Sequence, residues 1–158
     1  MKNILAFILI ICSSPIFAQA SIARSELKLE QVPLDVIDGF QRMHLETNAE
    51  VWRESGGQYQ AEYMEDGQVH YDLFNSSGNY IETKTPFAWE KAPKILKNGL
   101  NKTYYKYWEV LESYEITDET NNLYYTIRVK NKEDGTERTV YFDKEGTLEA
   151  KSKSDFTE

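Results

Sequence analysis

The chain has 158 residues and a formal net charge of −8, and this length is enough for one compact domain with an ordinary core. Because nucleic acid and anionic lipid are both negatively charged, we expect a chain with this acidic balance to bind neither. Its single cysteine lies within the first 20 residues, so the rest of the chain offers no thiol for disulfides, thiolate metal sites or cysteine nucleophiles.

Residues 1–20 have the pattern of a secretory signal peptide. A basic residue precedes the apolar run "ILAFILII", which is too short to span a bilayer and breaks at "CSSP". Ala18 and Ala20 stand at the −3 and −1 positions of a cleavage site, so we expect cleavage after Ala20, with cleavage after Ala18 as the alternative. Cys12 comes early in the run and follows a large residue, which disfavours a lipoprotein signal. These features predict a periplasmic or secreted protein, and no later stretch reaches transmembrane length.

The remaining sequence contains two similar halves. The segment "VPLDVIDGF" at 32–40 matches "APKILKNGL" at 92–100 on a proline and a glycine. Further on, "FNSSGNYIETKT" at 74–85 matches "FDKEGTLEAKSK" at 142–153. The offset is 60 residues for the first pair and 68 for the second, so the second half holds about eight more residues between these anchors. We place this insertion at "TDETNN", where turn-forming and charged residues cluster. We therefore predict two tandem repeats, which are residues 21–86 and 87–158.

Each repeat is predicted to open with a helix. Pro33 and Pro93 suit the first turn of a helix, where the missing N–H would be unpaired in any case. Apolar residues then recur at helical spacing, and we expect these faces to be buried. In the first repeat they are Val36, Ile37 and Phe40, followed by Met43 or His44. In the second repeat they are Leu96, Leu100, Thr103, Tyr104 and Tyr107.

Each repeat then changes to the pattern of antiparallel strands. The segments "QYQAEYM" and "LYYTIRV" alternate with a period of two, which predicts strands with one covered face. The "EDG" triplets at 65–67 and 133–135 predict hairpin turns, and Gly78 and Gly146 are expected to adopt positive φ in the last turn of each repeat. A helix with three or four antiparallel strands buries little surface alone. We therefore expect an α+β fold of two layers, in which both repeats share one sheet.

The order of these motifs resembles that of a known family. A "VP…V…F" helix, "AEVW", a "Y.AEY" strand, an "EDG" turn and an "F[ND]..G" hairpin resemble the PepSY-like, β-lactamase-inhibitor-protein-like (BLIP-like) family of secreted bacterial proteins. The resemblance covers both halves of the chain after the signal peptide. It implies helices on one face of an antiparallel sheet, and a periplasmic or outer-surface location in a Gram-negative bacterium. It implies no activity, and no residue here matches the inhibitor's target-contacting residues.

Catalytic and metal-binding chemistry finds little support in the sequence. His44 is expected to have a structural role at a helix boundary. His70 and Asp72 share one face of a strand, but no nucleophile motif accompanies them, so a cross-strand polar contact is the better interpretation. One histidine with one carboxylate is a poor zinc site. The turn at Asp143 lacks the alternating oxygen ligands of a calcium loop, so turn chemistry is preferred there. We predict no cofactor, no metal, no catalytic residue and no enzymatic activity.

Aromatic side chains mark the predicted binding surface. On their strands, Tyr124 and Tyr141 alternate with the apolar core positions. If the helices cover one sheet face, both tyrosines project from the other, near Arg128. Exposed tyrosine, tryptophan and arginine on a rigid sheet are typical of protein-binding hot spots. The candidate binding residues are Tyr124, Tyr141, Arg128, Trp52 and Tyr71. For Trp52 and Tyr71, the alternation pattern defines the sheet face less clearly. In the alternative interpretation, both sheet faces are partly packed, or the two repeats stack on each other there.

Two functions follow from these observations. The first is a non-catalytic binding module whose helix-free sheet face and hairpin loops engage a protein or peptide of the cell envelope. The second is a periplasmic sensor or carrier of a small ligand or divalent cation, bound through the acidic loops "EITDET" (115–120) and "NKEDGTE" (131–137). Burial of the helix-free face by the chain itself would remove the main support for the first function.

Overall fold

The computed structural model describes residues 26–149. The predicted signal peptide and the last part of the second repeat, residues 150–158, lie outside the described residues. In chain order the elements are β1 (Glu26–Leu27), η1 (Leu29–Gln31), α1 (Leu34–Met43), β2 (Val51–Ser55), β3 (Gln58–Glu65), β4 (Gln68–Asn75), β5 (Tyr80–Pro86), η2 (Trp89–Lys91), α2 (Lys94–Asn101), η3 (Tyr104–Tyr107), β6 (Glu109–Asp118), β7 (Leu123–Lys130), β8 (Glu137–Asp143) and β9 (Leu148–Glu149).

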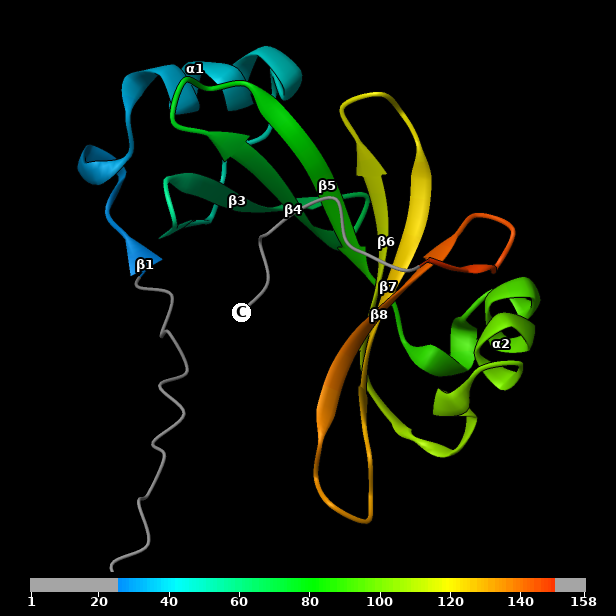
Figure 1. Cartoon of the computed structure of the whole chain (residues 1–158). Coiled ribbons are helices and arrows are strands. Elements are labelled where there is room, and N and C mark those ends of the chain that lie inside the picture. The colour runs from blue at the N-terminus through cyan, green and yellow to red at the C-terminus, as the bar shows by residue number, and fades with distance from the viewer. Residues whose placement is uncertain (1–25, 150–158) are drawn as a thin grey trace, which may run out of the picture.

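The described strands form one antiparallel sheet in the order β1 to β9, so every strand pairs with its neighbours in sequence. The pairing continues from β5 to β6, where Glu82 lies opposite Asp118 and Pro86 lies opposite Tyr114. The sheet therefore crosses the predicted repeat boundary without a break. Figure 1 shows that it also twists strongly between β3–β5 and β6–β8. The predicted α+β class, with a shared antiparallel sheet, is confirmed.

Both α-helices pack on the same face of the sheet, and Figure 1 shows them far apart. Each begins directly after its proline, as predicted. The core of α1 consists of Val36 and Phe40 packed on Trp52, Ala61, Tyr63 and Phe74. The core of α2 consists of Leu96 and Leu100 packed on Tyr125, Ile127, Val129, Val140 and Phe142. The period-two phase predicted for β3 and β7 is confirmed by these two clusters.

A pair of glycines joins each helix to a hairpin turn. Gly39 of α1 faces the backbone of Gly78, and Gly99 of α2 faces the backbone of Gly146, with no room for a Cβ at any of the four positions. Gly78 and Gly146 have φ angles of +73° and +77°, as predicted for the closing turns. The backbone of each helix can therefore pack directly against the backbone of its hairpin turn.

The predicted extension of the second helix is wrong. α2 ends at Asn101, and the backbone N–H of its C-cap residue Lys102 bonds carbonyls of the last turn. The Thr103 hydroxyl then accepts a hydrogen bond from the backbone N–H of Tyr105 and so caps a separate 3₁₀-helix, η3. Because this break changes the direction of the chain, Tyr104 and Tyr107 are 78% and 79% exposed rather than buried.

Candidate functional site

Strand register places four of the five predicted binding residues on the helix-free face. Tyr71, Lys84, Ile116 and Tyr124 lie opposite one another on β4 to β7. Tyr141 pairs with Thr126, and Arg128 follows two positions later on the same face. The rings of Tyr71 and Tyr114 meet edge to face, at 6.4 Å between their centroids.

Trp52 is the exception, and its predicted place on this face is wrong. The side chain is only 5% exposed, and its ring packs edge to face on Phe40 of α1. The reason is strand register, because Trp52 pairs with Ala61, which faces the helix. Val51 and Trp52 are both apolar and adjacent, so the local pattern of β2 does not reveal which one points inward.

The centre of the helix-free face is buried, which limits the predicted open surface. Leu73, Glu82 and Ile116 are each 1% exposed, and Gln60 and Thr126 are also buried. All five lie on the face that neither α-helix covers. A binding surface on this side must therefore lie toward its ends rather than across its middle.

A buried carboxylate anchors one of the predicted tyrosines. The Tyr124 hydroxyl donates a hydrogen bond to Glu82 Oε2 at 2.5 Å, and Lys84 Nζ lies 3.1 Å from Glu82 Oε1. Because a buried charge without partners is costly, these two contacts make Glu82 tolerable in the sheet interior. Sequence reasoning missed Glu82, since "YIETKT" surrounds it with polar residues and offers no sign of burial.

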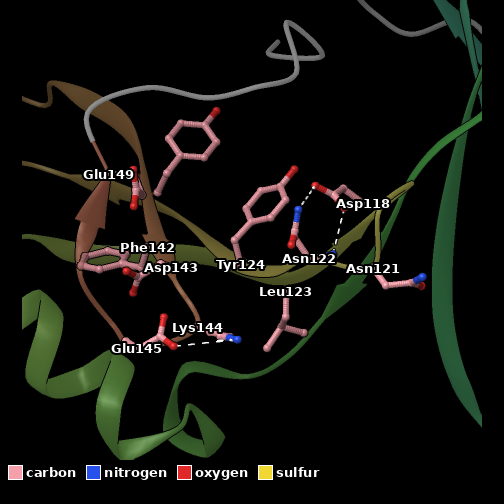
Figure 2. A pocket seen from close by; sticks show the side chains of 11 residues that line it. Asp118, Asn121, Asn122, Leu123, Tyr124, Phe142, Asp143, Lys144, Glu145 and Glu149 are labelled. Atoms are coloured by element: carbon pink, nitrogen blue, oxygen red, sulfur yellow. Dashed lines mark hydrogen bonds and ion pairs between the residues drawn. The ribbon is translucent and has the colours of Figure 1, made fainter.

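An open groove lies at the end of this face, between the β6–β7 turn and the β8–β9 turn. Its volume is about 430 Å³. The lining residues are Asp118, Asn121, Asn122, Leu123, Tyr124, Tyr141, Phe142, Asp143, Lys144, Glu145 and Glu149. Figure 2 shows Tyr124 between the Asp118–Asn122 turn and the strand that carries Phe142 and Asp143. Two predicted binding residues, Tyr124 and Tyr141, therefore share one concave site.

The groove is predominantly acidic. Asp118, Asp143, Glu145 and Glu149 line it, and the one basic side chain among its described lining residues, Lys144, lies 3.9 Å from Glu145. Aromatic rings beside carboxylates suit a cationic group, because the carboxylates supply opposite charge and the ring faces supply cation–π attraction. The groove is therefore chemically suited to a lysine, an arginine or a small amine.

Asp118 also organises the β6–β7 turn. Its carboxylate accepts hydrogen bonds from the backbone N–H group and the side chain of Thr120. It accepts two more from the backbone N–H group and the side chain of Asn122 (Figure 2). Partial burial opposes ionisation, but these hydrogen bonds outweigh it and lower the pKa of Asp118 to about 2. This residue therefore keeps its negative charge at the groove throughout the physiological pH range.

We expect the Asp118 carboxyl to titrate at about pH 2 in a carboxyl-detected NMR titration. Because the folded pKa lies below the unfolded value, the resulting stability is fully present above about pH 4 and is lost as the pH falls toward 2. Solvent screening limits it to less than about 1 kcal/mol. In Asp118→Ala this part of the pH dependence of unfolding should disappear. A titration midpoint near pH 4 in the wild type would contradict the expectation.

A second buried carboxylate, Asp72, lies on the opposite face beneath α1. It is fully buried and accepts hydrogen bonds from the Tyr63 hydroxyl at 3.1 Å and the Thr83 hydroxyl at 2.6 Å. His44 Nε2, at the C-terminus of α1, lies 2.7 Å from Asp72 Oδ2. Burial and the nearby Asp72 charge raise the pKa of Tyr63 well above its ordinary range. These contacts form a structural network, and the partnership of Asp72 with His44 was not predicted from the sequence.

The two histidines and Asp143 have the structural contacts predicted for them. His70 Nδ1 forms a cross-strand contact with the Thr85 hydroxyl at 2.9 Å, and His44 ties the end of α1 to the sheet. Asp143 accepts the backbone N–H of Thr147 within its turn. Within residues 26–149, no group of three or more histidine, cysteine or acidic side chains is arranged to hold a metal ion.

Arg128 lies on the predicted face but bridges two neighbouring strands. Its guanidinium forms ion pairs with Glu112 of β6 at 2.5 Å and Glu137 of β8 at 3.1 Å. The side chain therefore contributes to cross-strand pairing, and it is not among the residues that line the groove.

Several solved structures from Bacteroides share this fold. A DUF2874 family protein from Bacteroides ovatus is 20% identical with a TM-score of 0.65, over 73% of this chain and 83% of that one. A BLIP-like protein from Bacteroides fragilis is 19% identical with a TM-score of 0.62, over 78% and 89%. A candidate periplasmic protein from Bacteroides eggerthii is 14% identical with a TM-score of 0.64, over 74% and 85%. The chain therefore has a BLIP-like fold.

No protein-family model matches the sequence, and no curated protein matches it. The likeness to the Bacteroides structures is therefore a likeness of fold. Among residues 26–149, no helix has both the length and the apolar character needed to cross a membrane.

Proposed function

We propose that this chain is a periplasmic or secreted, non-catalytic binding module that engages a protein or peptide of the cell envelope. The contact surface is the acidic, tyrosine-lined groove at the end of the helix-free face. The observation that carries the proposal is the placement of Tyr124 and Tyr141 in one open groove, beside four carboxylates. A basic side chain of the partner, inserted between the tyrosines, is the interaction that this chemistry favours.

The interior of the fold supports this use of the groove. Tyr124 is held by its hydrogen bond to buried Glu82, so its ring presents a fixed surface. A rigid ring loses little conformational entropy when a partner binds, and this is one reason why tyrosine is frequent in binding hot spots. The acidic turn at Asp118 is held by its own hydrogen bonds in the same way.

We expect Tyr141→Ala to weaken capture of the envelope partner by about tenfold or more, because the substitution removes one of the groove's two tyrosine rings. The measurement is affinity capture from the envelope fraction of the source bacterium, with quantitative mass spectrometry of the retained proteins. Tyr124→Phe, which keeps the ring and removes the hydroxyl, should weaken capture less than Tyr141→Ala does.

Met64→Ala is the control for this experiment. Met64 is an exposed apolar residue of β3 that does not line the groove, so its substitution should leave capture unchanged. If Tyr141→Ala retained every protein that the wild type retains, at equal abundance, the groove would not be the contact surface.

A second candidate function is the binding of a small cationic ligand in the same groove. The volume of about 430 Å³ is within the range of small-ligand sites, and the acidic lining supplies the charge complementarity. An organic amine is favoured over a bare metal ion, because the described residues hold no cluster of metal ligands. A rise in melting temperature with a small amine, lost in Tyr141→Ala, would favour this function over peptide binding.

Export and internal duplication complete the proposal. The signal-peptide pattern, cleaved after Ala20, would deliver the chain to the periplasm, which agrees with the description of one structural neighbour. The two glycine contacts, Gly39 with Gly78 and Gly99 with Gly146, support an origin by duplication of one PepSY-like unit, with the boundary after Pro86.

A further inference from the structure

The two helical segments of the chain carry opposite charges. Residues 29–48, which include η1 and α1, contain four acidic residues and one arginine, a local charge of −3. Residues 89–108, which include η2, α2 and η3, contain five lysines and one glutamate, a local charge of +4. The two segments stand 60 residues apart, at matching places in the repeated pattern. A cluster of +4 in a chain of net charge −8 is a strong local departure from the average.

These charges face solvent and are not neutralised locally. Asp35 and Asp38 of α1 are exposed, as are Lys94 of α2 and its C-cap residue Lys102. None of the ion pairs within the described range, residues 26–149, involves any of these four side chains. Each segment can therefore offer its full charge to a partner.

Large apolar side chains are exposed beside both sets of charges. Leu34 and Leu45, at the two ends of α1, are 77% and 90% exposed. Tyr104 and Tyr107 follow α2 on η3, and Lys106 Nζ lies 4.6 Å from the centroid of the Tyr107 ring. Apolar and aromatic side chains surrounded by charges have the composition of protein–protein interfaces.

We propose that the two surfaces bind each other between copies of this chain. The acidic helix surface comprises Leu34, Asp35, Asp38 and Leu45, and the basic helix surface comprises Lys94, Lys102, Tyr104 and Tyr107. The two helices lie far apart on one molecule, so the contact forms between molecules (Figure 1). The leucines and tyrosines supply apolar contact, and the aspartates and lysines set the orientation. Because each copy presents both surfaces, copies associate as a closed pair or head to tail.

The net charge of −8 repels copies at long range, whereas the proposed surfaces attract at contact. At about 0.1 M salt the screening length is roughly 10 Å, which confines the long-range repulsion and leaves contacting charges effective. At about 1 M salt the screening length falls to roughly 3 Å and the attraction also weakens. Association should therefore be measurable at about 0.1 M salt and decrease at about 1 M.

The test is sedimentation velocity of the exported chain, purified from the periplasm. We expect the sedimentation coefficient to rise with protein concentration at about 0.1 M salt, and the dissociation constant to increase at least about tenfold at about 1 M. Two charge-reversed variants separate the surfaces. The first is Asp35→Lys with Asp38→Lys, and the second is Lys94→Glu with Lys102→Glu. Each variant alone should stay monomeric, because its two helix surfaces then have the same charge. An equal mixture of the two variants should associate again, because the charges are complementary once more.

Three results would overturn the proposal. They are a monomeric wild type at every concentration and salt, association that persists in both reversed variants, and a mixture that remains monomeric. Circular dichroism and the urea midpoint of each variant verify folding, and the exposed positions should keep both close to the wild type. Vesicles containing phosphatidylglycerol form a further arm. If the wild type binds these vesicles without self-association, and Lys94→Glu with Lys102→Glu abolishes that binding, the basic helix surface would be assigned to anionic lipid instead.

Discussion

Gly78→Ala is expected to lower the free energy of unfolding by about 3 kcal/mol or more. A Cβ at this position would stand 1.9 Å from the backbone oxygen of Asp35 in α1, and the φ angle of +73° adds backbone strain. Because the nearest atom belongs to the helix backbone, no side-chain rotation can relieve the clash. The helix would have to move away from the sheet and expose Phe40. Urea unfolding followed by circular dichroism gives the measurement.

Gly67→Ala is the matched control for this substitution. Gly67 has a φ angle of +75°, but a Cβ there meets nothing within 4 Å, so only the backbone strain of about 1–2 kcal/mol remains. Gly146→Ala should repeat the large effect at the second helix, where the Cβ would stand 2.5 Å from the oxygen of Ile95. Equal costs for Gly78→Ala and Gly67→Ala would show that the close approach of helix and hairpin contributes nothing.

Asp72→Ala is expected to cost about 3 kcal/mol, because it removes a fully buried acceptor from three partners. The Tyr63 hydroxyl, the Thr83 hydroxyl and His44 Nε2 would all lose this contact, and the last of these ties the end of α1 to the sheet. The free energy of unfolding in urea, compared with that of the wild type, measures the effect.

The contribution of His44 can be isolated with a double-mutant cycle. If His44 and Asp72 interact as the 2.7 Å contact indicates, the costs of His44→Ala and Asp72→Ala should deviate from additivity by at least about 1 kcal/mol. Asp38→Ala, an exposed aspartate on the same helix, should change stability by less than about 0.5 kcal/mol. Additive costs, or an Asp72→Ala cost as small as that of Asp38→Ala, would argue against a coupled network.

The sequence was most informative where local chemistry dictates conformation. Pro33 and Pro93 marked the starts of both helices, and the alternation around Ala61 and Ile127 marked the buried phase of two strands. The sequence was least informative where strand register decides which face of the sheet a side chain occupies. Trp52 faces the core only because β2 pairs with Ala61 of β3, and a shift of one residue would turn the ring outward.

The candidate site was likewise predicted only in part from the sequence. The alternation of β7 and β8 predicted that Tyr124 and Tyr141 share the helix-free face, and both strands run to the groove. The carboxylates around them come from the ends of β6 and β8, the β8–β9 turn and β9, so the pairing of strands in the sheet was required to bring them into one groove. Buried Glu82 could not be foreseen either, since its partner Tyr124 is 42 residues away.

The sequence by itself determined the two helix-and-hairpin patterns, the glycine turns and the acidic character of the chain, because these depend on residue type and short spacing. Only the tertiary structure decided which aromatic residues are buried, where the groove lies and which carboxylates enter the interior. Those outcomes depend on strand register and sheet twist, which are set by contacts between distant residues. The sequence contains the difference in charge between the acidic helix surface and the basic helix surface. Only the fold places these two surfaces far apart on the molecule (Figure 1).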